Sequence, residues 1–135
     1  MTTAEGAETL VRLQQVVKSF RRGGETLTVL DGLDMEIPRG SFEALMGPSG
    51  SGKSTLLNLI AGLDRATTGK VTVAGNDLGA LSDGQLAAFR ARHLGFIFQS
   101  YNLMPVLTAA ENVELPLLLT KLPRAERRKR ALIAL

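Results

Sequence analysis

The sequence predicts an α/β fold, and three observations support this prediction. Residues 47–55 read GPSGSGKST and match the pattern G-x-x-x-x-G-K-[ST]. A short apolar segment, Phe42–Met46, precedes the pattern, and the good helix formers of Leu56–Ala61 follow it. Before the loop, residues 9–18, 27–30 and 33–37 have the pattern of strands, and residues 33–37 alternate apolar and acidic side chains as in a strand with one exposed face. A strand, a glycine-rich loop and a helix therefore form the expected core, after an antiparallel β part.

The residues before the loop predict the antiparallel sheet. We expect one strand at Thr9–Lys18, a turn at Arg21–Glu25 and a second strand that resumes at Leu27–Leu30. Residues 33–37 alternate apolar and acidic side chains, which indicates a half-exposed strand that residues 38–40 close.

Several elements follow the loop. Gly62 is expected to end the first helix, and Val71–Ala74 to form a short strand. Ser82 and Gln85 have the spacing of a capping box, which predicts a helix that runs towards Arg92. The apolar residues 94–98 then predict a buried strand.

The last part of the chain predicts helices. Thr108 and Glu111 form a second capping-box pattern, and Pro123 is a suitable start for a last helix. The expected apolar residues of these two helices are Val113, Leu117, Leu118, Ala125, Leu132 and Leu135.

The loop pattern carries specific chemistry. Glycines allow the backbone to approach an anion closely, successive amides form an anion-binding nest, and the following helix adds the positive end of its dipole. Lys53 brings a charge to the outer phosphates, and Ser54 offers a hydroxyl to Mg²⁺. The predicted ATP-binding residues of the loop are Gly47, Pro48, Ser49, Gly50, Ser51, Gly52, Lys53, Ser54 and Thr55.

The composition limits the class of protein. The 135 residues are enough for one domain with a hydrophobic core, and 44% of them are hydrophobic. The chain has no cysteine, which excludes a disulfide framework and thiolate chemistry. The N-terminus lacks the features of a secretory signal, and no apolar stretch is long enough for a transmembrane helix. We therefore expect a cytoplasmic protein.

The basic residues are unevenly distributed. The net charge is +3, and residues 124–130 hold five basic residues and one glutamate. A surplus confined to one predicted helix disfavours nucleic-acid binding, which needs a broad basic face. A solvated helix face is the simplest interpretation, and contact with an acidic partner or membrane headgroups is the alternative.

Several further short motifs occur before and after the loop. They are Lys18-Ser19-Phe20, Gly62-Leu63-Asp64, Thr67-Thr68-Gly69, residues 95–103 (GFIFQSYNL) and residues 107–113 (LTAAENV). Together they resemble the ATP-binding subunits of ABC transporters, closest to the bacterial branch of lipoprotein release, macrolide export and the related cell-division transporter. The resemblance runs from about Leu10 to Leu135.

The resemblance implies how the chain is organised. Residues 1–135 would be the N-terminal portion of one nucleotide-binding domain with a P-loop NTPase core, incomplete at the C-terminus. The antiparallel β part would cover about 9–46 and 70–75, the P-loop core 47–63 and 94–99, and the start of the helical subdomain 100–135.

The resemblance also implies roles for single residues. Phe20 matches the aromatic residue that stacks on adenine, and Gln99 matches the glutamine that joins the Mg²⁺ shell and helps place the attacking water. Lys53 and Gln99 are thus the expected catalytic residues, Ser54 and Gln99 the expected metal ligands, and ATP and Mg²⁺ the expected cofactors.

Three further features of the sequence are not assigned a functional role. Residues 81–85 (LSDGQ) look like the family signature but precede Gln99, so we interpret them as a helix cap. His93 does not correspond to the family's switch histidine and is expected to be structural. Glu43 stands where the family has an apolar residue, so we expect it to be paired or near the edge of the sheet.

Three functional hypotheses remain. The first is an ATPase subunit that couples ATP binding and hydrolysis to export or release through a membrane permease. Its partners would be a second nucleotide-binding domain and the permease, without nucleic acid, on the inner face of the plasma membrane. The second is a truncated fragment that binds ATP without turnover, because the signature and the catalytic glutamate do not occur. The third is another P-loop enzyme, such as a small-molecule kinase or a GTPase.

Overall fold

The computed structural model describes residues 8–98 and 100–135. The chain divides into two compact units, Met1–Gly95 and Phe96–Leu135. Among the helices of the described residues, none combines the length and the apolar character that crossing a membrane requires.

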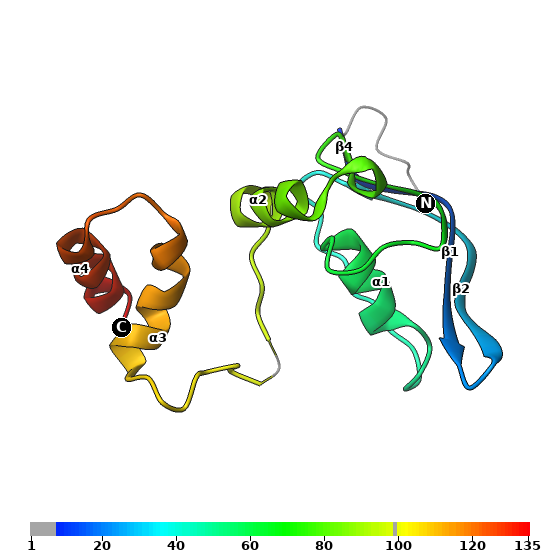
Figure 1. Cartoon of the computed structure of the whole chain (residues 1–135). Helices are drawn as coiled ribbons and strands as arrows, with labels where there is room; N and C mark the ends of the chain where they lie inside the picture. Colours follow the sequence, from blue (N-terminus) through cyan, green and yellow to red (C-terminus); the bar gives the residue numbers. More distant parts are fainter. Residues whose placement is uncertain (1–7, 99) are drawn as a thin grey trace. The chain divides into compact units, whose positions relative to one another are not determined.

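A four-stranded antiparallel sheet forms the first unit (Figure 1). Its strands are β1 (Thr9–Arg22), β2 (Glu25–Pro38), β3 (Thr68–Val73) and β4 (Asn76–Asp77), in the order β2-β1-β3-β4. The predicted antiparallel part is therefore confirmed. The two predicted pieces of the second strand form one continuous strand, β2.

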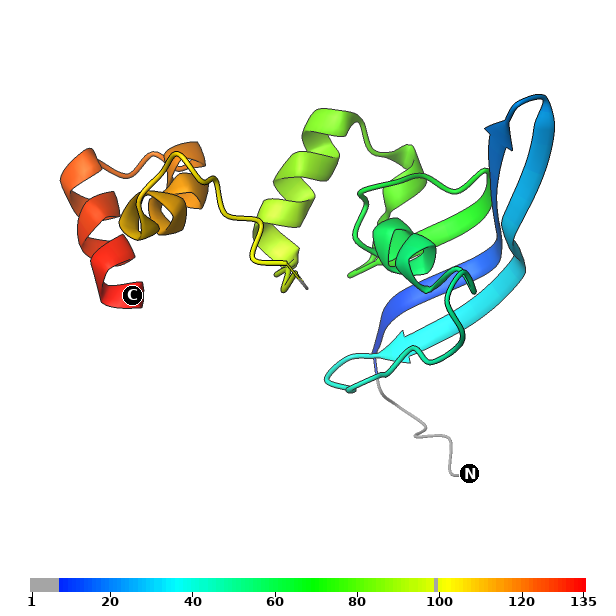
Figure 2. The same ribbon diagram turned by 90° about the horizontal axis from the view of Figure 1, so that it is seen from below.

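The hairpin of β1 and β2 is irregular and curved, as Figure 2 shows. Its pairing register shifts at several points, and Gln15 has a left-handed backbone with φ of 47°. The backbone amide and the side-chain amide of Gln15 both donate to the carboxylate of Asp34 on β2. Because bulges increase the local twist, they explain the bend of the hairpin.

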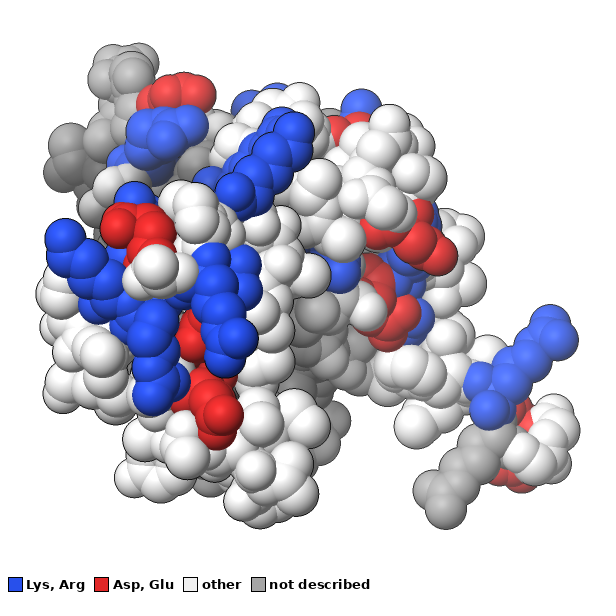
Figure 3. Space-filling view, turned by 60° about the vertical axis from the view of Figure 1, so that its left-hand side comes forward, with Lys and Arg blue, Asp and Glu red and all other residues white. Residues whose placement is uncertain are grey.

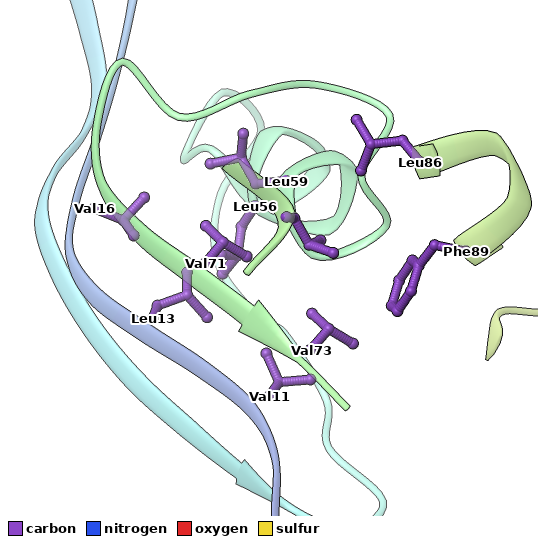
Figure 4. Close-up of a cluster of buried hydrophobic side chains, with 10 residues drawn as sticks. Val11, Leu13, Val16, Leu56, Leu59, Val71, Val73, Leu86 and Phe89 are labelled. Atoms are coloured by element: carbon purple, nitrogen blue, oxygen red, sulfur yellow. The ribbon is translucent and has the colours of Figure 1, made fainter. Parts of the chain in front are cut away.

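Two helices cover the sheet in the first unit. Helix α1 (Lys53–Ile60) buries Leu56 and Leu59, and α2 (Asp83–His93) buries Leu86 and Phe89, after the 3-10 turn η1 (Leu78–Ala80). Figure 4 shows these side chains directed towards the apolar side chains of β1 and β3. The buried residues of the strands are Val11, Leu13, Val16, Val71 and Val73.

The predicted helix boundaries follow local signals. Ser82 caps α2, since its Oγ accepts from the amide of Gln85 at 3.4 Å while Gln85 Oε1 accepts from the amide of Ser82 at 2.8 Å. Gly62, with φ of 61°, donates to Leu59 O at 3.1 Å just after α1. Both predictions are confirmed.

Two predicted strands do not form. Residues 42–46 and 94–98 have no regular secondary structure. The side chains of Phe42 and Ile97 are almost fully exposed, at 96% and 102%. A strand of a parallel sheet exists only through hydrogen bonds to its neighbours, and among the described residues no strand pairs with either segment.

The second unit contains α3 (Ala109–Glu114), the 3-10 helix η2 (Leu115–Leu119) and α4 (Arg124–Ala134). Thr108 and Glu111 form the predicted capping box, and the hydrogen bonds from Thr108 lower the pKa of Glu111. Helix α3 ends before Leu117 and Leu118, contrary to our prediction, because Pro116 lies one residue after its C-cap and cannot continue the α-helical hydrogen bonds.

The core face of α4 also differs from the prediction. Ala125, Leu132 and Leu135 are exposed, whereas Ala131 is 1% exposed. Ala131 lies one turn after Arg127, which contacts Glu114 of α3. The helix therefore turns the face of residues 127 and 131 inward.

The basic run of α4 is partly neutralised. Arg127 Nε lies 3.4 Å from Glu114 Oε1, Arg128 Nη1 lies 3.9 Å from Glu114 Oε2, and Arg130 Nε lies 2.8 Å from Glu126 Oε1. Figure 3 shows acidic side chains interspersed among the Lys and Arg side chains. These pairs support the interpretation of the run as a solvated helix face.

The first prediction concerns the bulge of β1. Gly69 has φ of 86°, and a Cβ there would collide with the carbonyl oxygen of Gln15. We expect Gly69→Ala to lower the free energy of unfolding by about 2 kcal/mol or more, measured by urea denaturation.

Gly75→Ala is the matched control. Gly75 has φ of 75°, and nothing lies within 4 Å of its Cβ position, so this variant adds backbone strain without the collision. Equal destabilisation by the two substitutions would contradict the close approach of Gly69 to β1.

Candidate nucleotide-binding site

The loop of residues 47–55 leads directly into α1 (Figure 1). Gly52 is the N-cap of α1, and it caps without a side-chain hydrogen bond. The first turn contains no acidic residue. The amides of this turn and the positive end of the helix dipole are thus available to an anion. The helix after the loop is as predicted, but the strand before it does not form.

Gly52 shows why the loop needs glycine. Its φ is 85°, and a Cβ there would lie 3.1 Å from Leu30 Cδ2 and 3.2 Å from Val29 Cγ1. A larger residue would therefore be strained and would push the helix start away from β2. Gly52 is itself buried, so the backbone runs directly against the sheet at this point.

Lys53 is held by the loop itself. Its Nζ donates to Gly47 O at 2.8 Å, to Pro48 O at 2.7 Å and to Ser51 Oγ at 3.2 Å. Its charge is therefore placed over the glycine-rich turn, where a phosphate would meet it.

The loop lines a pocket of about 520 Å³. The lining residues are Val29, Ser49, Gly50, Ser51, Gly52, Lys53, Ser54 and Thr55. Ser54 is exposed and Thr55 is half-buried, so both hydroxyls belong to the wall of an open site. The pocket thereby brings together residues 49–55 of the predicted phosphate-binding set, whereas Gly47 and Pro48 do not line it and instead accept hydrogen bonds from Lys53.

Phe20 lies on β1 and pairs with Leu27 of β2, two residues before the pocket residue Val29. Its side chain is 41% exposed, and Lys18 Nζ lies 4.8 Å from the centre of its ring. An aromatic ring thus lies on the strand pair that supplies part of the pocket wall.

Comparisons with known proteins identify the family of this chain. The sequence profile of the ABC transporter family matches residues 30–135. The chain belongs to the ABC transporter family. The matched range of residues 30–135 includes the loop, α1, α2 and the whole second unit.

Relatives of this ABC protein are similar over most of its length. It is 48% identical over 122 residues to the macrolide export ATP-binding/permease protein MacB of Brucella abortus, and 44% identical to the uncharacterized ABC transporter ATP-binding protein YknY of Bacillus subtilis. Each match covers 90% of this chain, but only 19% of MacB and 53% of YknY.

A solved structure is also similar. The dimeric ATP-binding cassette MJ0796, in a post-hydrolysis state bound to ADP and Pi, matches with a TM-score of 0.81 and 45% identity. An ABC transporter ATP-binding protein of this name comes from Methanocaldococcus jannaschii. The match covers 90% of this chain and 54% of that one, so the chain spans about half of such a cassette.

One predicted site residue cannot be placed in this structure. Gln99 lies outside the described residues. Among the residues that are described, no three His, Cys, Asp or Glu side chains are grouped to hold a metal ion. A Mg²⁺ ion at Ser54 would thus depend on phosphate oxygens and water for other ligands, as this metal commonly does.

The features set aside in the sequence have structural roles. Ser82 and Gln85 form the capping box of α2, and His93 stacks on Phe89 with ring centres 4.8 Å apart. Glu43 is exposed in an irregular segment and forms no ion pair among the described residues. The expected pairing of Glu43 is therefore wrong, because exposure removes the cost of its charge. The alternative, a position near the edge of the sheet, agrees with the structure, since Glu43 lines a hollow together with residues 35–37 of the edge strand β2.

Three residues around the site, Val29, Lys18 and Asp64, received no functional role from the sequence. Val29 forms part of the pocket wall, and Lys18 joins Phe20 to Asp64. The spacing of Lys18 and Phe20, two residues apart on a strand, was the available signal, since such residues share a face.

The carboxylate of Asp64 is half-buried next to Lys18. Burial raises its pKa, but the hydrogen bond from Lys18, the hydrogen bond from the Arg65 amide and the charge of Lys18 together lower it below its usual value. The Lys18–Asp64 pair therefore stabilises the fold when Asp64 is ionised.

A pH dependence follows from this lowered pKa. The stabilisation is present above the unfolded pKa, near 3.8, and is lost as the pH falls through the lower folded value. We expect Asp64→Asn to destabilise the chain at pH 7 and to differ less from the native chain below pH 4, measured by urea denaturation at each pH. If the free energies of unfolding of the variant and the native chain differ by the same amount at every pH, the ionised Lys18–Asp64 pair does not stabilise the fold.

Proposed function

We propose that this chain is the N-terminal part of an ATP-binding subunit of an ABC transporter, and that it binds ATP with Mg²⁺ at residues 47–55. The observation that carries the proposal is the position of Lys53, whose Nζ lies over a glycine-rich turn at the start of α1. Membership of the family supports the same activity, since ATP hydrolysis is characteristic of it.

Each residue of the loop would make a different contact with the nucleotide or the metal. The amides of the first turn of α1 would donate to phosphate oxygens, and Lys53 would exchange its two carbonyl contacts for outer phosphate oxygens, which bind a cation more strongly. The hydroxyl of Ser54 would ligate Mg²⁺, and Thr55 would donate to a phosphate. The metal would neutralise charge on the phosphates.

Two further residues complete the proposed site. Phe20 would stack on the adenine base, which requires little reading of the base edge. Gln99 would contribute its amide oxygen to the metal shell and orient the attacking water. Lys53 and Gln99 are thus the residues of this chain that we assign to catalysis.

The proposed partners are a second nucleotide-binding domain and a membrane permease. The dimeric state named for MJ0796 and the combined ATP-binding/permease protein MacB support them. The part that follows Gln99 would dock on the permease, and ATP binding and hydrolysis would drive export or release of its substrate. The subunit would lie on the cytoplasmic face of the plasma membrane, without nucleic acid.

A second candidate function is ATP binding without turnover by these 135 residues alone. The observation in its favour is that no carboxylate lines the loop pocket among the described residues. A general base for water is therefore not supplied by the pocket wall.

The binding assignment is tested with Lys53→Ala. We expect Mg²⁺-dependent ATP binding by the native chain and a loss of at least about tenfold in the variant, because a charged hydrogen bond to phosphate is removed. Isothermal titration calorimetry measures both affinities. Lys70→Ala is the control, since Lys70 is an exposed lysine of β3 outside the loop pocket. ATP binding by Lys53→Ala equal to that of the control would refute the site.

The two candidate functions differ in turnover. If the 135-residue chain binds without turnover, its release of phosphate from ATP will equal that of Lys53→Ala. Phosphate release by the native chain above that background, in a coupled colorimetric assay, would reject the second candidate.

A further inference from the structure

We propose that Lys18 is a positioning residue for the base of the nucleotide: its ammonium holds one face of the Phe20 ring and leaves the other face for the base. This inference rests on the proposed function. Lys18 Nζ lies 4.8 Å from the centre of the Phe20 ring, within the range of a cation–π contact.

The ammonium of Lys18 is fixed in place. It donates to Asp64 Oδ1 at 2.6 Å and to Arg65 O at 2.9 Å, and its side chain is only 11% exposed. Lysine side chains are usually mobile, so a lysine that is held by two acceptors provides a fixed cation against one face of the ring.

The backbone around Phe20 is held by the same turn. The regular pairing of β1 with β3 ends at Val17, opposite Thr68. Beyond that point, the Thr67 amide donates to Val17 O at 2.8 Å, and the Ser19 amide donates to Thr67 Oγ1 at 3.0 Å. The turn of residues 64–67 thus binds both the strand and the Lys18 side chain.

This turn also connects to the phosphate loop. It follows α1, which begins at Lys53 and ends at Ile60, and Leu63 and Asp64 donate their amides to Asn58 O at 2.9 and 3.2 Å. The helix that carries the phosphate loop at its start therefore carries the support of Phe20 at its end. The distance between the phosphate and base positions is fixed by one short helix and its turn.

The cation has an electronic consequence as well. Lys18 attracts the π electrons of Phe20 towards its own side, so the opposite face of the ring is less negative. A purine that stacks in an offset arrangement on that face meets less repulsion between the two π systems. The 41% exposure of Phe20 agrees with a ring that keeps one side open.

The test compares a ligand that has a base with one that does not. Isothermal titration calorimetry gives the affinities of Mg²⁺-ATP and of Mg²⁺-tripolyphosphate for the native chain and for Lys18→Met. We expect the variant to bind ATP about fivefold more weakly and tripolyphosphate equally well. Weakening of both ligands by the same factor would assign Lys18 a structural role only and overturn the inference.

A double-mutant cycle with Phe20→Leu separates the two residues. In the Phe20→Leu background, Lys18→Met should leave the ATP affinity unchanged, since the ring through which Lys18 acts is absent. An undiminished effect of Lys18→Met in that background would overturn the inference. Lys70→Met is the matched control, because it removes an exposed lysine of β3 and should leave both affinities unchanged.

Two outcomes keep this inference distinct from the proposed function. If Lys53→Ala binds tripolyphosphate as well as the native chain does, the phosphate site fails and both proposals fall. If only the Lys18 variants lack the expected difference, the phosphate site stands. Lys18→Gln, which retains a donor for Asp64 without the charge, replaces Lys18→Met should the latter not fold, and the same comparison of ligands decides.

Discussion

The packing of α1 on the antiparallel sheet is the constraint on which the candidate site depends. Leu56 and Leu59 are buried in a common core with residues of β1 and β3. This packing brings the N-cap Gly52 so close to Val29 and Leu30 that a Cβ would lie 3.2 and 3.1 Å from them. The position of the phosphate loop therefore follows from the core of the first unit, and the contacts of Lys53 act within a frame already set.

Elements with a local cause were predicted well from the sequence. A capping box involves residues three apart, so Ser82 and Thr108 predict the starts of α2 and α3 without knowledge of the rest. Two predicted elements that depend on distant partners do not form, although the alternating pattern was enough to predict the antiparallel strands. Residues 42–46 and 94–98 have the composition of buried strands, but strand structure requires a paired neighbour.

The residues of the candidate site also differ in how far the sequence could predict them. The loop pattern predicts the residues that surround the pocket, because the geometry of residues 47–55 is determined within the segment and its helix. The place of Val29 in the wall and the contact of Lys18 with Asp64 depend on the pairing of β1 and β2 and on the register shift between Lys18 and Ser19. Strand register is decided by contacts far apart in sequence, which a single sequence does not contain.

The irregular segment before the phosphate loop has a practical consequence for handling the protein. Phe42 and Met46 expose 96% and 89% of their surfaces, on backbone that lies outside the sheet. Apolar side chains of this kind on unpaired backbone favour self-association. Hydrophobic attraction weakens on cooling. Dilute solutions of the protein will therefore stay monodisperse longest in the cold, and warming will promote aggregation.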